Sequence, residues 1–227
     1  AGARARRVLW MVGGAATAAL AAVVILALFD VGGLRSRFGF GAATKRITSL
    51  AILPLRNLSG DPEQEIFADG MTQEITTTIG RIRALKVISS TSAMNYKGTK
   101  KSLSEIASEL RVDALVEGSV LRAGPRVRVT VDLVEGATDH QLWASSYERD
   151  LRDVLALQAD VARAIAGEVR AALTPQEAAR LAQTRPVEPE AFEHSLAAHQ
   201  LMDMMTSAST RLAIDLFGKA IEEDPTY

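Results

Sequence analysis

The most restrictive feature of this sequence is a run of about 22 residues without a charged side chain, residues 8–29. A helix of this length rises about 1.5 Å per residue and spans the hydrocarbon core of a bilayer, which is about 30 Å thick. A helix also satisfies the backbone polar groups of the run inside lipid. A signal peptide is the alternative, because arginines precede the run, but the apolar part of a signal peptide is usually only about 7 to 15 residues long. We therefore predict a transmembrane helix over residues 8–29.

The charges around this run leave its orientation open. Three arginines precede it. The basic residues that follow it are Arg35, Arg37, Lys45 and Arg46. The positive-inside rule does not decide between the two orientations when the charges are so evenly balanced. Residues 30–46 contain four glycines and indicate a juxtamembrane linker. A row of small residues (Gly14, Ala18, Ala22) has the spacing of a helix-dimer contact, which makes a homodimer one expected arrangement.

Residues 47–173 alternate short apolar strands with amphipathic helices, which is typical of an α/β domain. The expected strands cover residues 47–55, 85–90, 114–122, 126–135 and 141–148. Helices are expected over residues 67–82, from Ser102 onward, and over residues 151–173. The helix at Ser102 begins with a capping box, since the Ser102 hydroxyl can accept from the third backbone amide and Glu105 can reach back.

Strand 126–135 indicates what kind of sheet these elements form. Its valines alternate with arginines and other polar residues, so one face is buried and the other is wet, as in an antiparallel strand. The earlier strands are joined by helices, which favours parallel neighbours. The order β-α-β-α-β-β-β-α therefore predicts an α/β fold with a mixed sheet and helices packed on it.

The C-terminal part reads as helices only. Thr174 can cap a short helix whose first position is Pro175, and residues 174–187 form this helix and the linker after it. Residues 188–227 then predict two antiparallel helices. The second resembles the second helix of a tetratricopeptide repeat (TPR), A-x3-F-x2-A-x4-P. The matching residues are Ala213, Phe217, Ala220 and Pro225.

In this interpretation Phe217 fills the groove between the helices and Pro225 ends the second one. The first helix departs from the pattern, because Leu201 stands where a small residue is usual. One repeat cannot bury its own face, so further repeats are expected beyond Tyr227. A protein or peptide partner would bind in the resulting groove.

The stretches "LAILPLRNLSGDPEQEIFADGMTQEI" and "VISSTSAMNYKGTKKSLSEIASELRVDALVEGSV" carry a family resemblance. From Ser49 to Leu173 the chain resembles the TolB amino-terminal-like domain, in the form found beside TPR repeats in bacterial membrane-anchored multidomain signalling proteins. The resemblance implies a domain that is not an enzyme. It also implies a single-pass protein of the inner membrane, with a cytoplasmic amino terminus and a periplasmic domain.

In such proteins the domain before the membrane helix is a winged-helix DNA-binding domain, a serine/threonine kinase or a nucleotide cyclase. Nucleic acid would accordingly be contacted only through an upstream domain. The resemblance leaves the output domain and the ligand open.

Five acidic residues crowd the segment after the first strand: Asp61, Glu63, Glu65, Asp69 and Glu74. Paired carboxylates could serve acid–base chemistry or hold a cation. The spacing lacks the register of an EF-hand, however, and Glu65 and Asp69 fall at a helix start, where the dipole favours negative charge. We interpret the segment as a strand-to-helix connection in which Gly70 relieves crowding against the sheet.

No residue pattern in the sequence identifies a catalytic, cofactor or metal site. There is no cysteine, which excludes disulfides and thiolate chemistry. The loop "YKGTKK" lacks the P-loop spacing and reads first as a solvated loop, although its lysines could touch an anion. The candidate partner-binding residues are Lys97, Lys100, Lys101, Met204 and Phe217.

These observations predict a non-catalytic sensor or scaffold module coupled to an upstream output domain. Two alternatives stay open. One is an envelope scaffold without an output domain, and the other is a small-molecule-binding α/β domain.

Overall fold

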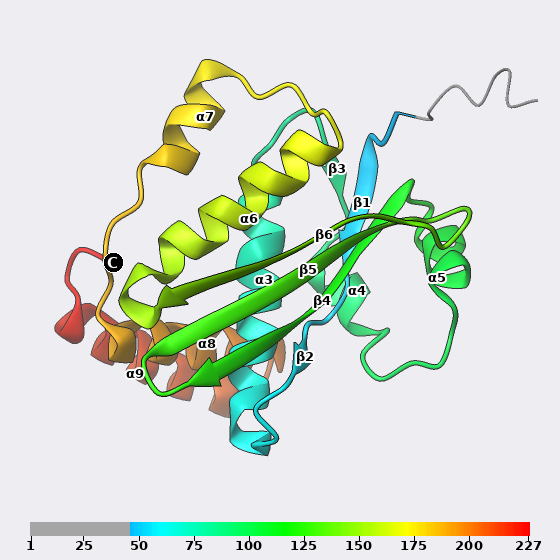
Figure 1. The fold of residues 1–227 in the computed structure, drawn as a ribbon. Helices are drawn as coiled ribbons and strands as arrows, with labels where there is room; N and C mark the ends of the chain where they lie inside the picture. The colour runs from blue at the N-terminus through cyan, green and yellow to red at the C-terminus, as the bar shows by residue number, and fades with distance from the viewer. Residues whose placement is uncertain (1–45) are drawn as a thin grey trace, which may run out of the picture. The chain divides into compact units, whose positions relative to one another are not determined.

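The computed structural model of the protein describes residues 46–227 (Figure 1). The predicted transmembrane helix at residues 8–29 and nearly all of the predicted linker lie outside these residues. Among the helices of residues 46–227, none combines the length and the apolar character that a membrane span requires.

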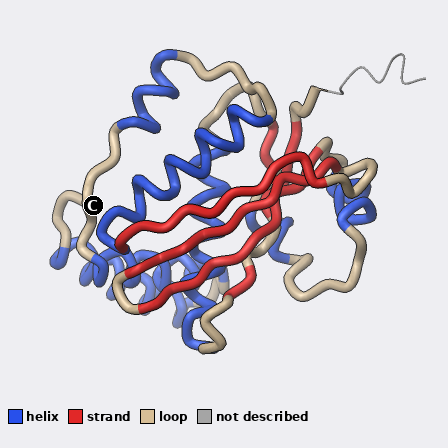
Figure 2. The backbone as a smooth tube through the Cα atoms, viewed as in Figure 1, coloured by secondary structure: helices blue, strands red, loops and turns tan. Residues whose placement is uncertain are grey.

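A mixed six-stranded sheet forms the centre of the α/β part (Figure 2). Its strands are β1 (Ser49–Ile52), β2 (Arg56–Asn57), β3 (Lys86–Val87), β4 (Ala114–Ala123), β5 (Arg126–Glu135) and β6 (Gln141–Asp150). The order is β3-β1-β4-β5-β6, and β2 pairs separately with β4. Strand β1 runs parallel to β3 and β4, whereas β4, β5 and β6 are antiparallel. The predicted mixed α/β sheet is thus confirmed.

The alternation in β5 has the predicted consequence. Val127, Val129 and Val131 are fully buried on the face that α3 and α6 cover, whereas Arg126 and Arg128 are exposed on the other face. Both arginines pair there with Glu148 of the neighbouring β6. The pattern of one dry and one wet face therefore fixes which side of the sheet receives the helices.

Seven helices accompany the sheet in the described part of the chain. They are α3 (Glu65–Gly80), α4 (Ser90–Met94), α5 (Leu103–Leu110), α6 (Val154–Glu168), α7 (Pro175–Ala182), α8 (Pro189–Asp203) and α9 (Ser207–Glu223). Helices α3 and α6 pack on one face of the sheet. Helix α5 covers the other face at β1 and β4, where Ile106 and Leu115 share a small second core.

Both predicted helix starts are present. Ser102 and Glu105 form the expected capping box, and Thr174 caps α7 with Pro175 in the first turn. Helix α7 also begins with a capping box, which Thr174 and Glu177 form, and Glu177 makes one further contact outside this helix. Its Oε1 accepts the backbone N–H of Arg83 at 2.9 Å, which fastens α7 to the end of α3.

Three local predictions were wrong. The expected strand 85–90 is only Lys86–Val87 and is followed by α4, because the Ser89 hydroxyl accepts from Ser92 N and starts a helix there. The short strand β2 was not expected. The helix expected over residues 151–173 begins with a 3-10 turn and ends at Glu168, and Arg170 then adopts a left-handed φ of 53°.

Gly70 faces α8 and not the sheet, which corrects the expectation from the sequence. A Cβ at Gly70 would lie 2.8 Å from Cδ2 of Leu196, so α8 approaches α3 at a position that has no side chain. Phe192 of α8 is fully buried beside this contact, and its ring meets Phe67 edge-on at 6.2 Å. The helical hairpin α8–α9 therefore shares the main core with the α/β part.

The end of the hairpin is fixed by an ion pair. Asp224 accepts from Arg185 Nη1 at 2.9 Å, and this hydrogen bond, with that from Thr226, lowers the pKa of Asp224 to about 2. The guanidinium of Arg185 also lies over the ring of Tyr227, which itself lies 6.3 Å from the ring of Phe192. These contacts join the segment between α7 and α8 to the last turn after α9.

A double-mutant cycle tests the docking of α8 on α3. We expect Gly70→Ala to destabilise the protein, because overpacking costs about 1–3 kcal/mol and the gain in helix propensity is only about 1 kcal/mol. In the background of Leu196→Ala, which itself costs about 2–5 kcal/mol, the same change should cost less, because both Cδ atoms are gone and only the Cβ of residue 196 remains, at 3.0 Å. Urea unfolding followed by circular dichroism measures all four free energies.

The matched control is Gly218→Ala in α9, where an added Cβ meets nothing within 4 Å. It should stabilise the protein in both backgrounds. Equal effects of Gly70→Ala with and without Leu196 would contradict the docking contact.

Candidate functional site

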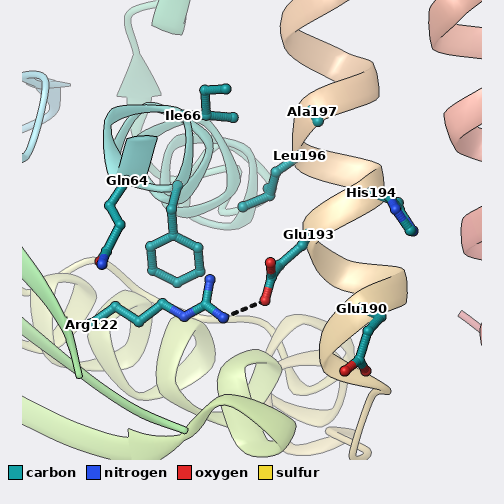
Figure 3. Close-up of a pocket in the computed structure, with 9 residues that line it drawn as sticks. Gln64, Ile66, Arg122, Glu190, Glu193, His194, Leu196 and Ala197 are labelled. Atoms are coloured by element: carbon teal, nitrogen blue, oxygen red, sulfur yellow. Dashed lines mark hydrogen bonds and ion pairs between the residues drawn. The ribbon is translucent and has the colours of Figure 1, made fainter. Parts of the chain in front are cut away.

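A cavity of about 300 Å³ lies where the α/β part meets the helical hairpin (Figure 3). Its walls come from the start of α3, the end of β4 and the first half of α8. The lining residues are Gln64, Ile66, Phe67, Arg122, Glu190, Glu193, His194, Leu196 and Ala197. We call this cavity the junction cleft.

Arg122 is the central side chain of the junction cleft. It leaves β4 on the face that the helices cover, and its guanidinium lies 5.4 Å from the centre of the Phe67 ring. Its Nη2 donates to Glu193 Oε1 of α8 at 2.5 Å (Figure 3). The side chain is about three-quarters buried, so solvent screens this pair less than a surface pair. Arg122 therefore ties the sheet to the hairpin by charge and by its contact with an aromatic ring.

Gln64 supplies an unused acceptor. Its Oε1 is buried and has no hydrogen-bond partner within the described residues, while its Nε2 makes a long contact of 3.4 Å with Asp61. A buried acceptor without a partner costs about 1–3 kcal/mol. A guest with an N–H or O–H group would remove that cost only if Gln64 turned this atom toward the cleft, because less than 1 Å² of it is accessible.

The histidine of the cleft points elsewhere. Figure 3 shows His194 directed away from Arg122, toward the neighbouring helix α9, where its Nδ1 lies 2.8 Å from Glu223 Oε2. Glu190 also turns away from Arg122. Across residues 46–227, no three His, Asp or Glu side chains are grouped as a metal site would require.

The lysine loop and the acidic segment meet each other. Lys97 Nζ lies 2.9 Å from Glu65 and 2.6 Å from Asp69. Partial burial opposes the charge of Lys97, but its hydrogen bonds to Asp69 and Glu65 prevail and raise its pKa. The hydrogen bond from Lys97 lowers the pKa of Glu65. Two of the five carboxylates thus have a structural role, which agrees with the interpretation of this segment as a connection.

Glu74, the last acidic residue of the segment, lies apart from that pair. It is half-buried on α3, and burial raises its pKa.

The remaining candidate residues are dispersed. Lys101 pairs with Glu109 at 2.6 Å and lies over Tyr96, while Lys100 is exposed. Met204 is exposed at the end of α8. The structure therefore brings none of the five candidate partner-binding residues into the junction cleft, and their role in partner binding stays a prediction.

Phe217 differs from the expectation for a groove filler. It is only half-buried and meets the His199 ring edge-on at 5.0 Å. The contact between α8 and α9 is closed instead by Ala213 and Ala220, which are both buried.

The sequence analysis missed Arg122, Gln64 and Glu193. Arg122 stands 71 positions from Glu193, so no local pattern joins them. The available signal was Arg122 itself, a charged residue on the face of β4 that the helices cover.

The chain matches a known family over residues 45–164, described as HilA/YgeH-like transcriptional regulator, second domain. It is also 37% identical over 177 residues to a protein of Rhizobium meliloti named putative adenylate cyclase 3. That alignment includes 78% of this chain but only 30% of the relative, so the chain spans less than a third of the relative's length.

The chain is also similar to solved structures, at low identity and with low TM-scores. PelC of Paraburkholderia phytofirmans, a dodecamer, is 14% identical over 58% of this chain and 94% of its own, with a TM-score of 0.41. TolB of Acinetobacter baumannii is 12% identical over 57% of this chain and 30% of its own, with a TM-score of 0.40. The C-terminal domain of LpoB from Salmonella enterica is 12% identical over 52% and 93%, with a TM-score of 0.37. Similarities at this level identify neither a function nor a partner.

Unlike the similarities to solved structures, the family match is a match in sequence over more than half of the chain. It contains the whole sheet and most of α6. The chain therefore belongs to the family of the HilA/YgeH-like transcriptional regulator second domain.

Proposed function

We propose that this chain is a non-catalytic regulatory module of a bacterial signalling protein. The observation that carries the proposal is that related segments stand in proteins with two different named outputs. One is a family of transcriptional regulators, and the other is a putative adenylate cyclase of which the matching part is less than a third. A segment that accompanies different outputs is better suited to receive or relay a signal than to perform either output.

The junction cleft offers a physical route for such a relay. Arg122 of the sheet and Glu193 of the hairpin are joined directly, and Phe67 of α3 contacts residues of both. A ligand or partner that alters either side of the cleft changes contacts on the other side. The module would then act through the position of the hairpin, as a binding element with two arrangements.

The proposal places the chain in the inner membrane, with the described part on the periplasmic side. The uncharged run at residues 8–29 supports the anchor, and the topology implied by the TolB-like resemblance supports the side. An upstream output domain would then lie in the cytoplasm. Any contact with nucleic acid would be made by that domain.

The hairpin is proposed as the first repeat of a TPR array. Helix α9 exposes Ile214 and Ile221, which are seven positions apart and lie on one side of the helix, and each is more than half exposed. A helical segment, such as a following repeat or a partner peptide, would cover them.

The first prediction from this proposed function concerns catalysis. The purified chain, incubated with Mg²⁺ and ATP or GTP, should leave the nucleotides unchanged, because no three carboxylate or histidine side chains of residues 46–227 are grouped to hold Mg²⁺ beside a nucleotide. Mass spectrometry of the mixture measures this, with an active cyclase catalytic domain in the same buffer as control. Formation of a cyclic nucleotide would contradict the proposal of a non-catalytic module.

The second prediction concerns orientation. Alkaline phosphatase fused after Arg46 should be active, because the enzyme requires an extracytoplasmic location. The control replaces Ala18 and Ala22 by arginine, which should abolish insertion, since each charge at a helix centre costs about 2.5–3.5 kcal/mol. Activity restricted to a cytoplasmic reporter at the same position would reverse the proposed orientation.

The third prediction concerns the outer side of α9. A photo-crosslinking residue placed at Ile214 or Ile221 in cells should capture a covering protein segment. The same residue at Lys219, which is exposed and lies about 140° around α9 from Ile214, should capture little. The substitutions Ile214→Asp and Ile221→Asp should leave the melting temperature of this chain nearly unchanged. Equal capture from all three positions would refute a partner surface here.

A further inference from the structure

A second cavity lies between the end of α3, the middle of α6 and α7. Its volume is about 150 Å³. An engineered apolar cavity of about this size in another protein holds benzene. The space therefore admits a small organic body of about six carbon atoms and excludes a nucleotide or a peptide.

The floor of this cavity is apolar except for one side chain. Ile82 and Leu181 are buried there, together with Ala159. Gln158 is only 3% exposed, and its Nε2 approaches the sulfur of Met71 at 4.0 Å. That weak contact is the hydrogen bond that Gln158 makes within the described residues, although a buried amide normally has better partners. A polar substituent of a guest would find an underused partner at Gln158.

The mouth of the cavity is positively charged. Arg81 and Arg180 line it from α3 and α7, and both are exposed. Neither forms an ion pair of 4.0 Å or less with a residue of the described chain. Thr78 and Thr184 add hydroxyl groups to the same lining.

The one carboxylate in the lining is already engaged. Glu177 accepts the backbone N–H of Arg83 through Oε1, and the N–H and hydroxyl of Thr174 through Oε2. These hydrogen bonds lower the pKa of Glu177, that from Arg83 foremost. Glu177 therefore stays ionised in its structural role. Arg81 lies within electrostatic reach of the Glu74 carboxylate, but the two guanidinium groups at the mouth have no ion pair of 4.0 Å or less within the described residues and can still take up an external anion.

From this geometry we infer a binding site for a small organic carboxylate. The carboxylate lies between Arg81 and Arg180, where two guanidinium groups can each donate charge-assisted hydrogen bonds. The apolar body occupies the floor beside Ile82 and Leu181. A polar substituent at the far end reaches Gln158. The site is separate from the junction cleft and goes beyond the regulatory role proposed above, because it needs no protein partner.

Helix α7, which carries Arg180, is held to the rest of the fold by two hydrogen bonds. It is held to α3 by the bond from Arg83 N to Glu177, and to α6 by Arg163, whose Nη1 donates to the Leu181 carbonyl at 3.1 Å. Arg180 comes from this helix, so a bound carboxylate adds a further link between α7 and α3.

The test uses 4-fluorobenzoate as probe, observed by ¹⁹F NMR with the full chain. We expect binding that unlabelled benzoate displaces. Benzamide, which has nearly the same shape but no charge, should not displace the probe. The double variant Arg81→Gln/Arg180→Gln should raise the Kd at least about tenfold, whereas Arg211→Gln, an exposed arginine of α9, should leave it unchanged.

Four outcomes would overturn the site. They are the absence of probe binding, displacement by benzamide as effective as by benzoate, an unchanged Kd in the double variant, and full displacement by inorganic phosphate. The last would show an anion site that makes no use of the apolar floor. The variant Gln158→Leu tests whether Gln158 binds a polar substituent. In the wild type, 4-hydroxybenzoate should displace the probe better than benzoate does. In Gln158→Leu, the two compounds should displace it equally well.

Discussion

The burial of α3 on three sides is the constraint on which the rest of the described structure depends. The helix packs against the sheet, against α6 and against α8. Its residues Phe67, Met71 and Ile75 are almost completely buried, and each such side chain contributes about 1.5–3 kcal/mol when it leaves water. Because one helix serves three neighbours, none of them can be repositioned without exposing apolar surface of α3. Both cavities described above border this helix.

Most of the sheet could be predicted from the sequence, because its signals are local. The alternating valines of residues 126–135 predicted the wet and dry faces of β5. The capping box at Ser102 and the cap at Thr174, followed by Pro175, marked two helix starts. Helix α4 was missed because its start depends on a single serine, Ser89, in a segment with strand-like composition. The docking of α8 was missed because Gly70 and Leu196 are far apart in the chain, and a glycine in a helix gives no sign of what approaches it.

The candidate sites could be predicted less well, for a related reason. Lys97 and the acidic segment were both noticed, but their pairing depends on how the loop folds back onto α3. In the junction cleft, Arg122 and Glu193 acquire their roles only when the hairpin is docked. At the second cavity, Arg81 and Arg180 are ordinary surface residues in the sequence, and only the approach of α7 to α3 sets them at one opening. Properties that arise from packing leave no local pattern.

The contact at Gly70 also determines the register of α8 along α3. A shift by one helical turn, about 5.4 Å, would set Leu196 against the larger side chains of Ile66 or Glu74 instead of against bare backbone. The hairpin is therefore positioned by a missing side chain at Gly70, whereas the other glycine of α3, Gly80, has nothing within 4 Å of an added Cβ. A substitution of this one glycine would therefore disturb the register of the hairpin and leave the sheet intact, so a change in one codon would alter how the two parts are joined.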